Sequence, residues 1–424
     1  MVADWTVITL SEANVILIDC DHRTPPASEA GYPYIAIPQL RNGRIETATA
    51  RRITKNDFCE WTKKAKPTAN DVALSRRCNP GETAYVEPGM EFALGQNLVL
   101  LRADGTKVWP PFLRWLVRGP DWWEQVGKFL NVGAVFDSLK CADVPKFRLK
   151  IPPLQEQKAI AHILGALDDK IELNRRMNEA LEAMARALFK SWFVDFDPVR
   201  MKAEGRRRKA EKRPPTDSLH PSSFTLPPSL LDLFPDSFED SELGKTPKGW
   251  QVKPLGDLLE LAYGRALKAE DRQEGLIPVY GSNGAVGWHN ERLVKGPGIV
   301  VGRKGNPGVV KWIPCDFFPI DTTFYVIPKA CCNSLYFLFH ALQKHDLASL
   351  GADSAVPGLN RNLAYMNEQI LPSSPVLKAF DEVVSLYLAR AHEVENESQT
   401  LAMLRDTLLP KLISGELRVQ GRMA

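Results

Sequence analysis

The sequence predicts an α+β (α/β-type) protein, with two globular β-rich domains separated by an antiparallel two-helix coiled-coil spacer in a pseudo-twofold arrangement. The first observation is an internal repeat, in which Pro152, Lys158 and Leu181 recur 220 residues later as Pro372, Lys378 and Leu401. The second is that short apolar runs, broken by Gly, Pro and Asn, fill residues 1–150, as strands and turns do. The third is a long heptad pattern inside each repeat.

The heptad segments predict two long helices. The first segment opens after Pro152-Pro153 and contains no proline until Pro198, which allows a helix of about 40 residues, roughly 60 Å at 1.5 Å per residue. Its apolar seam includes Leu164, Leu167, Ile171, Leu181 and Leu188, and the second seam includes Val384, Leu401, Leu404 and Leu408. The simplest partner for each seam is the other one, in an antiparallel intramolecular coiled coil whose register Asn174 and Asn178 would fix. The alternative is that each helix only caps its own domain.

Composition shifts give the domain boundaries. They predict a first globular domain at 1–150, a spacer helix at 151–197 and a linker at 198–245, followed by a second globular domain at 246–373, a second spacer helix at 374–418 and a tail at 419–424. Pro410 is expected to kink the second helix, and Ser414-Gly415 to end it. The linker combines a basic run at 206–209 with two Pro-Pro pairs, which favours an extended connector with little core. The basic run is either a solvated linker or a phosphate-contacting segment.

Composition also limits the possible functions. The net charge of only +3 over 424 residues excludes a highly basic nucleic-acid coat, so any nucleic-acid contact must come from local patches. Seven cysteines without CxxC spacing favour reduced thiols and a cytoplasmic location over disulfides or a zinc site. We find no signal-peptide pattern and no apolar run long enough to span a membrane.

Catalytic motifs are absent from the sequence. No GxxxxGK[ST], GxSxG or HExxH pattern occurs, and GSNGAVG at 281–287 fails the dinucleotide spacing. We therefore expect no active site, metal or cofactor in this chain, and we expect His22 and His289 to be structural.

Two basic turns are the strongest binding signals. Arg76, Arg77 and Asn79 stand in Arg-Arg-Cys-Asn-Pro-Gly, and Arg303, Lys304 and Asn306 stand in Arg-Lys-Gly-Asn-Pro-Gly. Asn-Pro-Gly suits positions i to i+2 of a type II turn, which would project the cations from the end of a strand. Such cations can contact DNA phosphates or guanine, although solvated hairpin charges are the alternative. Gln96-Asn97 and Thr322-Thr323 are expected at equivalent places, either as buried hydrogen-bonding residues or as base readers.

Several segments together resemble the DNA-specificity subunit of Type I restriction–modification systems. IPPLQEQKAIAHILGALDDKIELNRRMNEALEAMARALFKSWFVDFDP (151–198) resembles the central conserved region of that family. IPVYGSNGAVGWHN (277–290), VVGRKGNPGVVKW (300–312), DTTFYVI (321–327) and AVPGLNR (355–361) resemble its target-recognition domain, as do GYPYIAIPQLRNGRI (31–45), ALSRRCNPGETAYV (73–86) and FALGQNLVLL (92–101). The resemblance covers nearly the whole chain.

The resemblance implies a function without catalysis. Each globular domain would read one half of a split duplex-DNA site, and the difference between the two domains indicates two different half-sites. The spacer helices would dock two methyltransferase subunits, and restriction/translocase subunits would complete the assembly. S-adenosylmethionine, ATP and magnesium would belong to those partners. The alternatives are a single-chain restriction or modification enzyme, which the missing motifs disfavour, and a coiled-coil scaffold without DNA reading, which the basic turns disfavour.

Specific residues follow from this interpretation. DNA contacts are predicted for the six turn residues named above and for Asn42, Arg44, Asn283 and Lys311 in the matching segments. Partner contacts are predicted for Leu164, Leu167, Ile171, Leu181, Leu188, Leu401, Leu404 and Leu408.

Overall fold

The chain forms two compact units that each combine sequence-distant segments. The computed structural model describes residues 4–133, 136–210, 226–350 and 358–419. Unit 1 contains Met1–Leu173 with Glu397–Ala424, and unit 2 contains Asn174–Asn396. In the described part of the chain, no helix is long and apolar enough to cross a membrane.

Unit 1 is built on three main sheets. A four-stranded sheet has the order β2-β10-β7-β8, a three-stranded sheet the order β6-β3-β9, and β1 pairs with β11. The bounds are β1 Thr6–Thr9, β2 Val15–Asp19, β3 Tyr32–Ile35, β6 Arg51–Ile53, β7 Val72–Ser75, β8 Thr83–Tyr85, β9 Ala93–Leu94, β10 Leu98–Ala103 and β11 Arg148–Ile151. A small hairpin joins β4 (Leu40–Arg41) and β5 (Arg44–Ile45). The β1–β11 pair closes the domain by joining its first and last strands.

Unit 2 repeats the three main sheets of unit 1. Its sheets have the orders β15-β21-β18-β19 and β17-β16-β20, and β14 pairs with β22. The bounds are β14 Gln251–Pro254, β15 Leu259–Tyr263, β16 Ile277–Gly281, β17 Gly284–His289, β18 Gly298–Gly302, β19 Val310–Ile313, β20 Phe318–Pro319, β21 Thr323–Pro328 and β22 Glu368–Leu371. In both units the outer pairs are antiparallel and one pair, β3–β9 or β16–β20, is parallel. The internal repeat predicted from the sequence is therefore confirmed at the level of sheet order.

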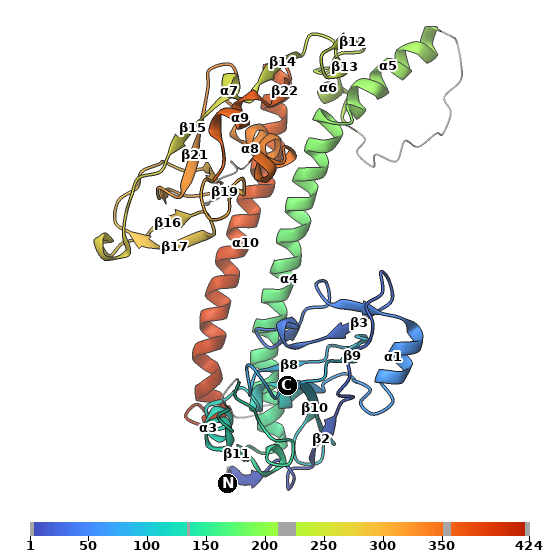
Figure 1. Cartoon of the computed structure of the whole chain (residues 1–424), viewed down its shortest axis with the longest axis vertical. Helices are drawn as coiled ribbons and strands as arrows, with labels where there is room; N and C mark the ends of the chain where they lie inside the picture. The colour runs from blue at the N-terminus through green and yellow to red at the C-terminus, as the bar shows by residue number, and fades with distance from the viewer. Residues whose placement is uncertain (1–3, 134–135, 211–225, 351–357, 420–424) are drawn as a thin grey trace. The chain divides into compact units, whose positions relative to one another are not determined.

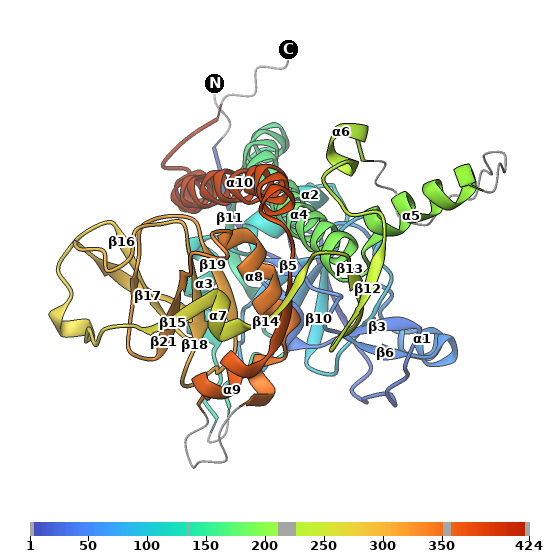
Figure 2. The same cartoon turned by 90° about the horizontal axis from the view of Figure 1, so that it is seen from above.

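Helices pack on these sheets. Their bounds are α1 Lys55–Trp61, α2 Pro110–Leu116, α3 Pro120–Phe129, α4 Leu154–Phe193, α5 Asp197–Ala210, α6 Pro228–Leu231, α7 Leu255–Leu258, α8 Leu335–Lys344, α9 Arg361–Met366 and α10 Ser374–Ser414, with 3-10 turns at Ile37–Gln39, Val144–Lys146, Ala269–Asp271 and Leu347–Leu350. Side chains cap α1, α8 and α9 at Thr54, Ser334 and Asn360 by accepting backbone N–H bonds. Figure 2 shows α8 lying beside the sheet of unit 2. This helix contacts β18 and β19.

The two long helices, α4 and α10, run antiparallel to each other (Figure 1). In unit 1 the carboxylate of Asp168 on α4 bonds Arg405 on α10 at 2.8 Å, and Leu164 shares a core with Leu412. In unit 2 the Asn178 side chain donates to Glu395 at 3.4 Å, and Leu188 shares a core with Val384 and Phe380. As the residue number increases along α4, the residue number of its contact on α10 decreases, which confirms the predicted antiparallel pair. The end of α10 is also as predicted, since Ser414 is its last residue and Gly415 has φ +79°.

The predicted linker at 198–245 is partly wrong. Residues 211–225 lie outside the described part, but α5 covers the start of this segment and Phe234 is buried in the core of unit 2. Residues at 238–247 form the hairpin of β12 (Phe238–Ser241) and β13 (Gly244–Pro247). Phe234 packs edge-on against Trp192 at 5.0 Å between ring centroids. The aromatic residues of this segment therefore add to the core of unit 2. The prediction of an extended connector rested on the proline and charge content of the segment and did not take these aromatic residues into account.

Candidate nucleic-acid interface

The first basic turn leaves the end of β7 in unit 1. The backbone N–H of Glu82 donates to the carbonyl of Asn79 at 3.3 Å, and Gly81 has φ +97°. This is the hydrogen bond and the glycine conformation of the predicted type II turn. Arg76 is half-buried at the base of the turn, and Arg77 is exposed.

A cavity of about 480 Å³ opens beside this turn. Its walls are formed by His22, Arg76, Arg77, Cys78, Gln96, Asn97 and Phe136. Two arginines, two amides and an imidazole line this space without a carboxylate among them. The cavity therefore offers hydrogen-bond donors and positive charge.

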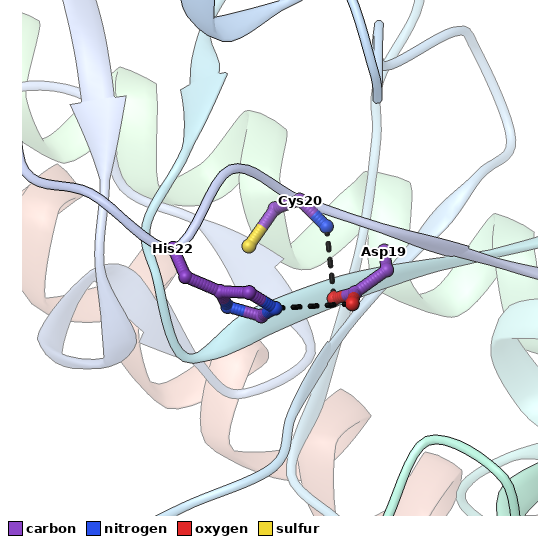
Figure 3. A group of neighbouring side chains, drawn as sticks. All are labelled: Asp19, Cys20 and His22. Carbon is purple, nitrogen blue, oxygen red and sulfur yellow. Dashed lines mark hydrogen bonds and ion pairs between the residues drawn. The ribbon is translucent and has the colours of Figure 1, made fainter.

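Asp19, Cys20 and His22 form a hydrogen-bonded cluster (Figure 3), and His22 lines the cavity. The ring nitrogens of His22 lie 3.1 Å from the carbonyl oxygen of Gln96 and 3.1 Å from the carboxylate of Asp19. The Cys20 thiol donates to the carbonyl of Gly95 at 3.3 Å, and burial raises the pKa of this thiol to about 11. The ligating atoms of Asp19, Cys20 and His22 lie within 4.8 Å of one another, as a metal centre would require. Because each of these groups already has a protein partner and the thiol keeps its proton, the arrangement favours a support for residues 95–97.

The second basic turn leaves β18 in unit 2, where Gly308 has φ +80°. Arg303 donates through Nη1 to the carbonyl of Asp321 at 2.7 Å. Its guanidinium carbon lies 5.0 Å from the ring centroid of Tyr263, and that of Arg361 lies 4.9 Å from the same ring. Tyr263 is 52% exposed, so this cation–π group is presented at the surface.

Three further predicted residues meet beside this turn. The amide nitrogen of Asn306 donates to the side-chain oxygen of Asn283 at 2.6 Å. Lys311 donates through Nζ to the backbone carbonyl of Asn283 at 3.0 Å. The structure thus brings these residues together as one exposed polar surface, although their contact with DNA stays a prediction.

Strand register shows which residues correspond between the units. Leu98 faces Ser75 in the β10–β7 pair, as Thr323 faces Gly302 in the β21–β18 pair. Arg76, which follows Ser75, therefore corresponds to Arg303. The predicted match of Gln96-Asn97 with Thr322-Thr323 was wrong by one residue. The backbone N–H of Arg76 donates to the carbonyl of Asn97, and that of Arg303 donates to the carbonyl of Thr322, so Gln96-Asn97 corresponds to residues 321–322.

The residues around this shared arginine differ. Asp19 faces Val99 across the β2–β10 pair, and Tyr263 faces Phe324 at the same place in the β15–β21 pair. Unit 1 thus has a carboxylate where unit 2 has an aromatic ring. The two units therefore share the turn and differ in the side chains beside it.

The hairpin residues Asn42 and Arg44 have structural roles that the sequence did not reveal. Asn42 and Gly43 have φ of 53° and 80°, as the central residues of a type I′ turn require. Arg44 forms an ion pair with Glu87 and donates through Nη2 to the carboxylate of Asp168 at 2.9 Å. Arg44 therefore links the domain to α4, and the DNA contacts predicted for Asn42 and Arg44 stay predictions.

Comparison with known proteins decides the family. The family model described as the Type I restriction modification DNA specificity domain matches residues 4–183 and 247–363, more than half of the chain. The chain belongs to the Type I DNA-specificity family. It is similar to the Type I restriction enzyme HindI specificity subunit of Haemophilus influenzae, with 26% identity over 85% of this chain and 89% of that one. It is also similar to the putative Type I restriction enzyme MjaX specificity subunit of Methanocaldococcus jannaschii, with 23% identity over 98% of this chain and 94% of that one.

A solved structure shows the same fold. The S subunit of a Type I restriction–modification system from M. genitalium superposes with a TM-score of 0.60 at 19% identity, covering 97% of this chain and 96% of that one. Specificity subunits recognise DNA sequence and take part in complex assembly without catalysis, and this chain is such a component.

The partner contacts predicted for the spacer of this specificity chain need correction. Leu164 and Leu188 are buried in the cores of units 1 and 2, and Leu408 packs against the core of unit 1. The remaining seam residues Leu167, Ile171, Leu181 and Leu401 are half-buried. Leu164, Leu188 and Leu408 pack against the other long helix and against the globular domains of the same chain, so they offer little surface to another subunit. Leu404, 46% exposed on α10, keeps its place as a predicted partner contact.

Sequence reasoning missed three residues near the basic turns of this specificity chain. Tyr263 and Arg361 join Arg303 from segments far apart in the sequence. His22, expected to be structural, also lines the cavity of unit 1. No local motif marks Tyr263 or His22, because the sheet order places the ends of β2 and β15 beside the turns. Arg361 closes the segment AVPGLNR (355–361), which was matched to the family without a role for this arginine. Residues 355–357 of the segment that resembled the family lie outside the described part.

Proposed function

We propose that the chain reads a bipartite sequence in duplex DNA, one half with each unit, and scaffolds a Type I restriction–modification complex. The observation that carries the proposal is the pair of units with identical sheet order, the same arginine at the same turn and different residues around it. Shared cations suit the phosphates common to all DNA, and divergent neighbours suit different base sequences.

The partners follow from the same proposal. Two units with one topology suit two copies of a methyltransferase subunit, with restriction/translocase subunits completing the assembly. S-adenosylmethionine, ATP and magnesium would be bound by those subunits in the cytoplasm. The exposed apolar residues Leu386, Met403 and Leu404 of α10 are candidate contacts with them.

The experiment is a map of methylated adenines in cells that express the chain with its methyltransferase subunit. We expect a motif with two specified halves around an unspecified gap. Variants of unit 1 should alter one half alone, and variants of unit 2 the other. A continuous motif, or loss of both halves from a change in one unit, would contradict the assignment of one half to each unit. Methylation by the purified chain alone would identify it as an enzyme instead.

A further inference from the structure

The cavity of unit 1 contains an arginine that forms no ion pair with the described residues. Among those residues, the buried Nε of Arg76 has no hydrogen-bond partner. Arg102 and Arg405 of the same unit instead pair with carboxylates, Asp71 at 2.6 Å and Asp168 at 2.8 Å. A donor that is shielded from water is costly when it is left without an acceptor. Arg76, at the wall of the cavity, is therefore positioned for an anion from outside the chain.

His22 supports one wall of this cavity. Its ring nitrogens lie 3.1 Å from the carbonyl oxygen of Gln96 and 3.1 Å from the carboxylate of Asp19. Lys64, whose Nζ lies 3.8 Å from the same carboxylate, offsets part of the negative charge of Asp19. Because both ring nitrogens already lie against groups of the chain, His22 positions residues 96–97 and does not contact the ligand.

The equivalent arginine of unit 2 is bound differently. Arg303 donates to a backbone carbonyl and lies over the Tyr263 ring, whereas Arg76 lies at a cavity whose other walls supply the donors of Arg77, Gln96 and Asn97. A guanidinium fork with neighbouring amides matches the oxygens of a phosphodiester. The base-reading alternative is weaker, because an arginine present in both divergent domains is poorly suited to selecting different bases.

We propose that the cavity lined by Arg76, Arg77, Gln96 and Asn97 binds one backbone phosphate of the DNA, with Arg76 as its principal donor. The proposal rests on the proposed function, and it assigns to unit 1 a phosphate anchor that unit 2 does not reproduce in the same form. The anchor would fix the position of the duplex on unit 1 while other residues select the bases.

The test measures binding of the assembled complex to two fluorescent duplexes, one with the methylated motif and one with that motif scrambled, over a range of salt concentrations. Arg76→Ala should weaken both duplexes by the same factor and lower the slope of log affinity against log salt by about one unit. Arg76→Lys should keep the slope and lose part of the affinity. Lys55→Ala, an exposed cation on α1, is the matched control and should change neither.

A methylphosphonate scan locates the contact. Phosphates of the motif duplex are neutralised one at a time. At one position, we expect neutralisation to lower the affinity of the wild-type complex and to leave the affinity of the Arg76→Ala complex unchanged. Loss confined to the motif duplex, or a slope that stays unchanged in Arg76→Ala, would overturn the anchor. If circular dichroism shows that Arg76→Ala does not fold, Arg76→Lys and the scan on the wild-type complex still test the anchor. A scan that finds no sensitive phosphate near the first half-site would exclude it. A wild-type complex that does not distinguish the two duplexes would refute the proposed function itself.

Discussion

At the residue scale, one buried carboxylate joins three arginines in unit 1. Asp168 on α4 lies 2.9 Å from Arg44, 3.6 Å from Arg114 and 2.8 Å from Arg405. Its partners come from a hairpin, from α2 and from α10, so this single side chain connects the recognition domain with both long helices. Charges removed from water are stable only while the pairing is complete.

Asp168→Ala should destabilise unit 1 strongly, because it leaves three shielded arginines without their common counter-charge. The expected loss in the free energy of unfolding is about 3–5 kcal/mol. Denaturant unfolding followed by tryptophan fluorescence measures it. The neighbouring Asp169, whose side chain is exposed, supplies the control Asp169→Ala. Equal losses in the two variants would show that the cluster contributes little.

His340 makes the stability of unit 2 depend on pH. The residue is 4% exposed, and burial lowers its pKa to about 4. The unfolded chain takes up this proton near pH 6.5 but the folded chain does not. Stability is therefore fully present above pH 6.5 and is lost as the pH falls toward 4.

His340→Leu should remove this pH dependence. Between pH 7 and pH 5, wild type should lose about 2 kcal/mol more unfolding free energy than the variant. Denaturant titrations at several pH values test this. Asp381 is a second contributor with the opposite sign, since burial raises its pKa to about 6 and favours the fold at low pH. The comparison must therefore be the difference between wild type and variant, and parallel pH profiles would contradict the role of His340.

At the element scale, the spacer helices separate residues that hold the fold from residues available to other subunits. Leu164 is fully buried among side chains of α4, α10 and the unit 1 core, whereas Leu404 is 46% exposed on α10. Both belong to the same heptad pattern, so periodicity alone assigns them the same role. Tertiary packing gives them different roles, because it buries Leu164 and leaves Leu404 exposed.

Substituting these two leucines should give opposite results. Leu164→Asp buries an unpaired charge and should unfold unit 1, at a cost of several kcal/mol. Leu404→Asp should leave the unfolding transition unchanged within about 0.5 kcal/mol and weaken co-purification with the methyltransferase subunit. Thermal unfolding combined with co-purification distinguishes the two effects. A Leu404→Asp chain that still assembles fully would remove this leucine from the docking surface.

At the scale of the whole molecule, α4 and α10 pair antiparallel, so a change in spacer length must be made in both. Seven residues inserted into one helix alone would keep its apolar seam on the same face, but they would lengthen that helix relative to the other and shift which residues meet beyond the insertion. One heptad added to each preserves the pairing and lengthens the pair by about 10.5 Å, roughly three base pairs of DNA.

The matched double insertion should therefore widen the unspecified gap of the methylated motif by about three base pairs, if the spacer sets that gap. Methylation mapping of the variant gives the answer directly. The chain with a single insertion is the control, and it should lose stability instead of gaining a new gap. An unchanged gap in a stable double-insertion chain would show that the helices do not set it.

The sequence by itself determined the repeat, the two long helices, their antiparallel pairing and the basic turns, because these depend on local periodicity and turn chemistry. Pro152-Pro153 and Gly415 mark helix ends through backbone geometry alone, and Asn-Pro-Gly specifies its turn in the same way. The tertiary structure decided which residues surround the turns. The fold brings Tyr263 from β15 and Arg361 from α9 to Arg303, and it brings His22 to the cavity beside Arg76. It also turned Arg44 toward Asp168 and buried Leu164 and Leu188. These outcomes depend on contacts between residues that are far apart in the sequence, which no local pattern encodes.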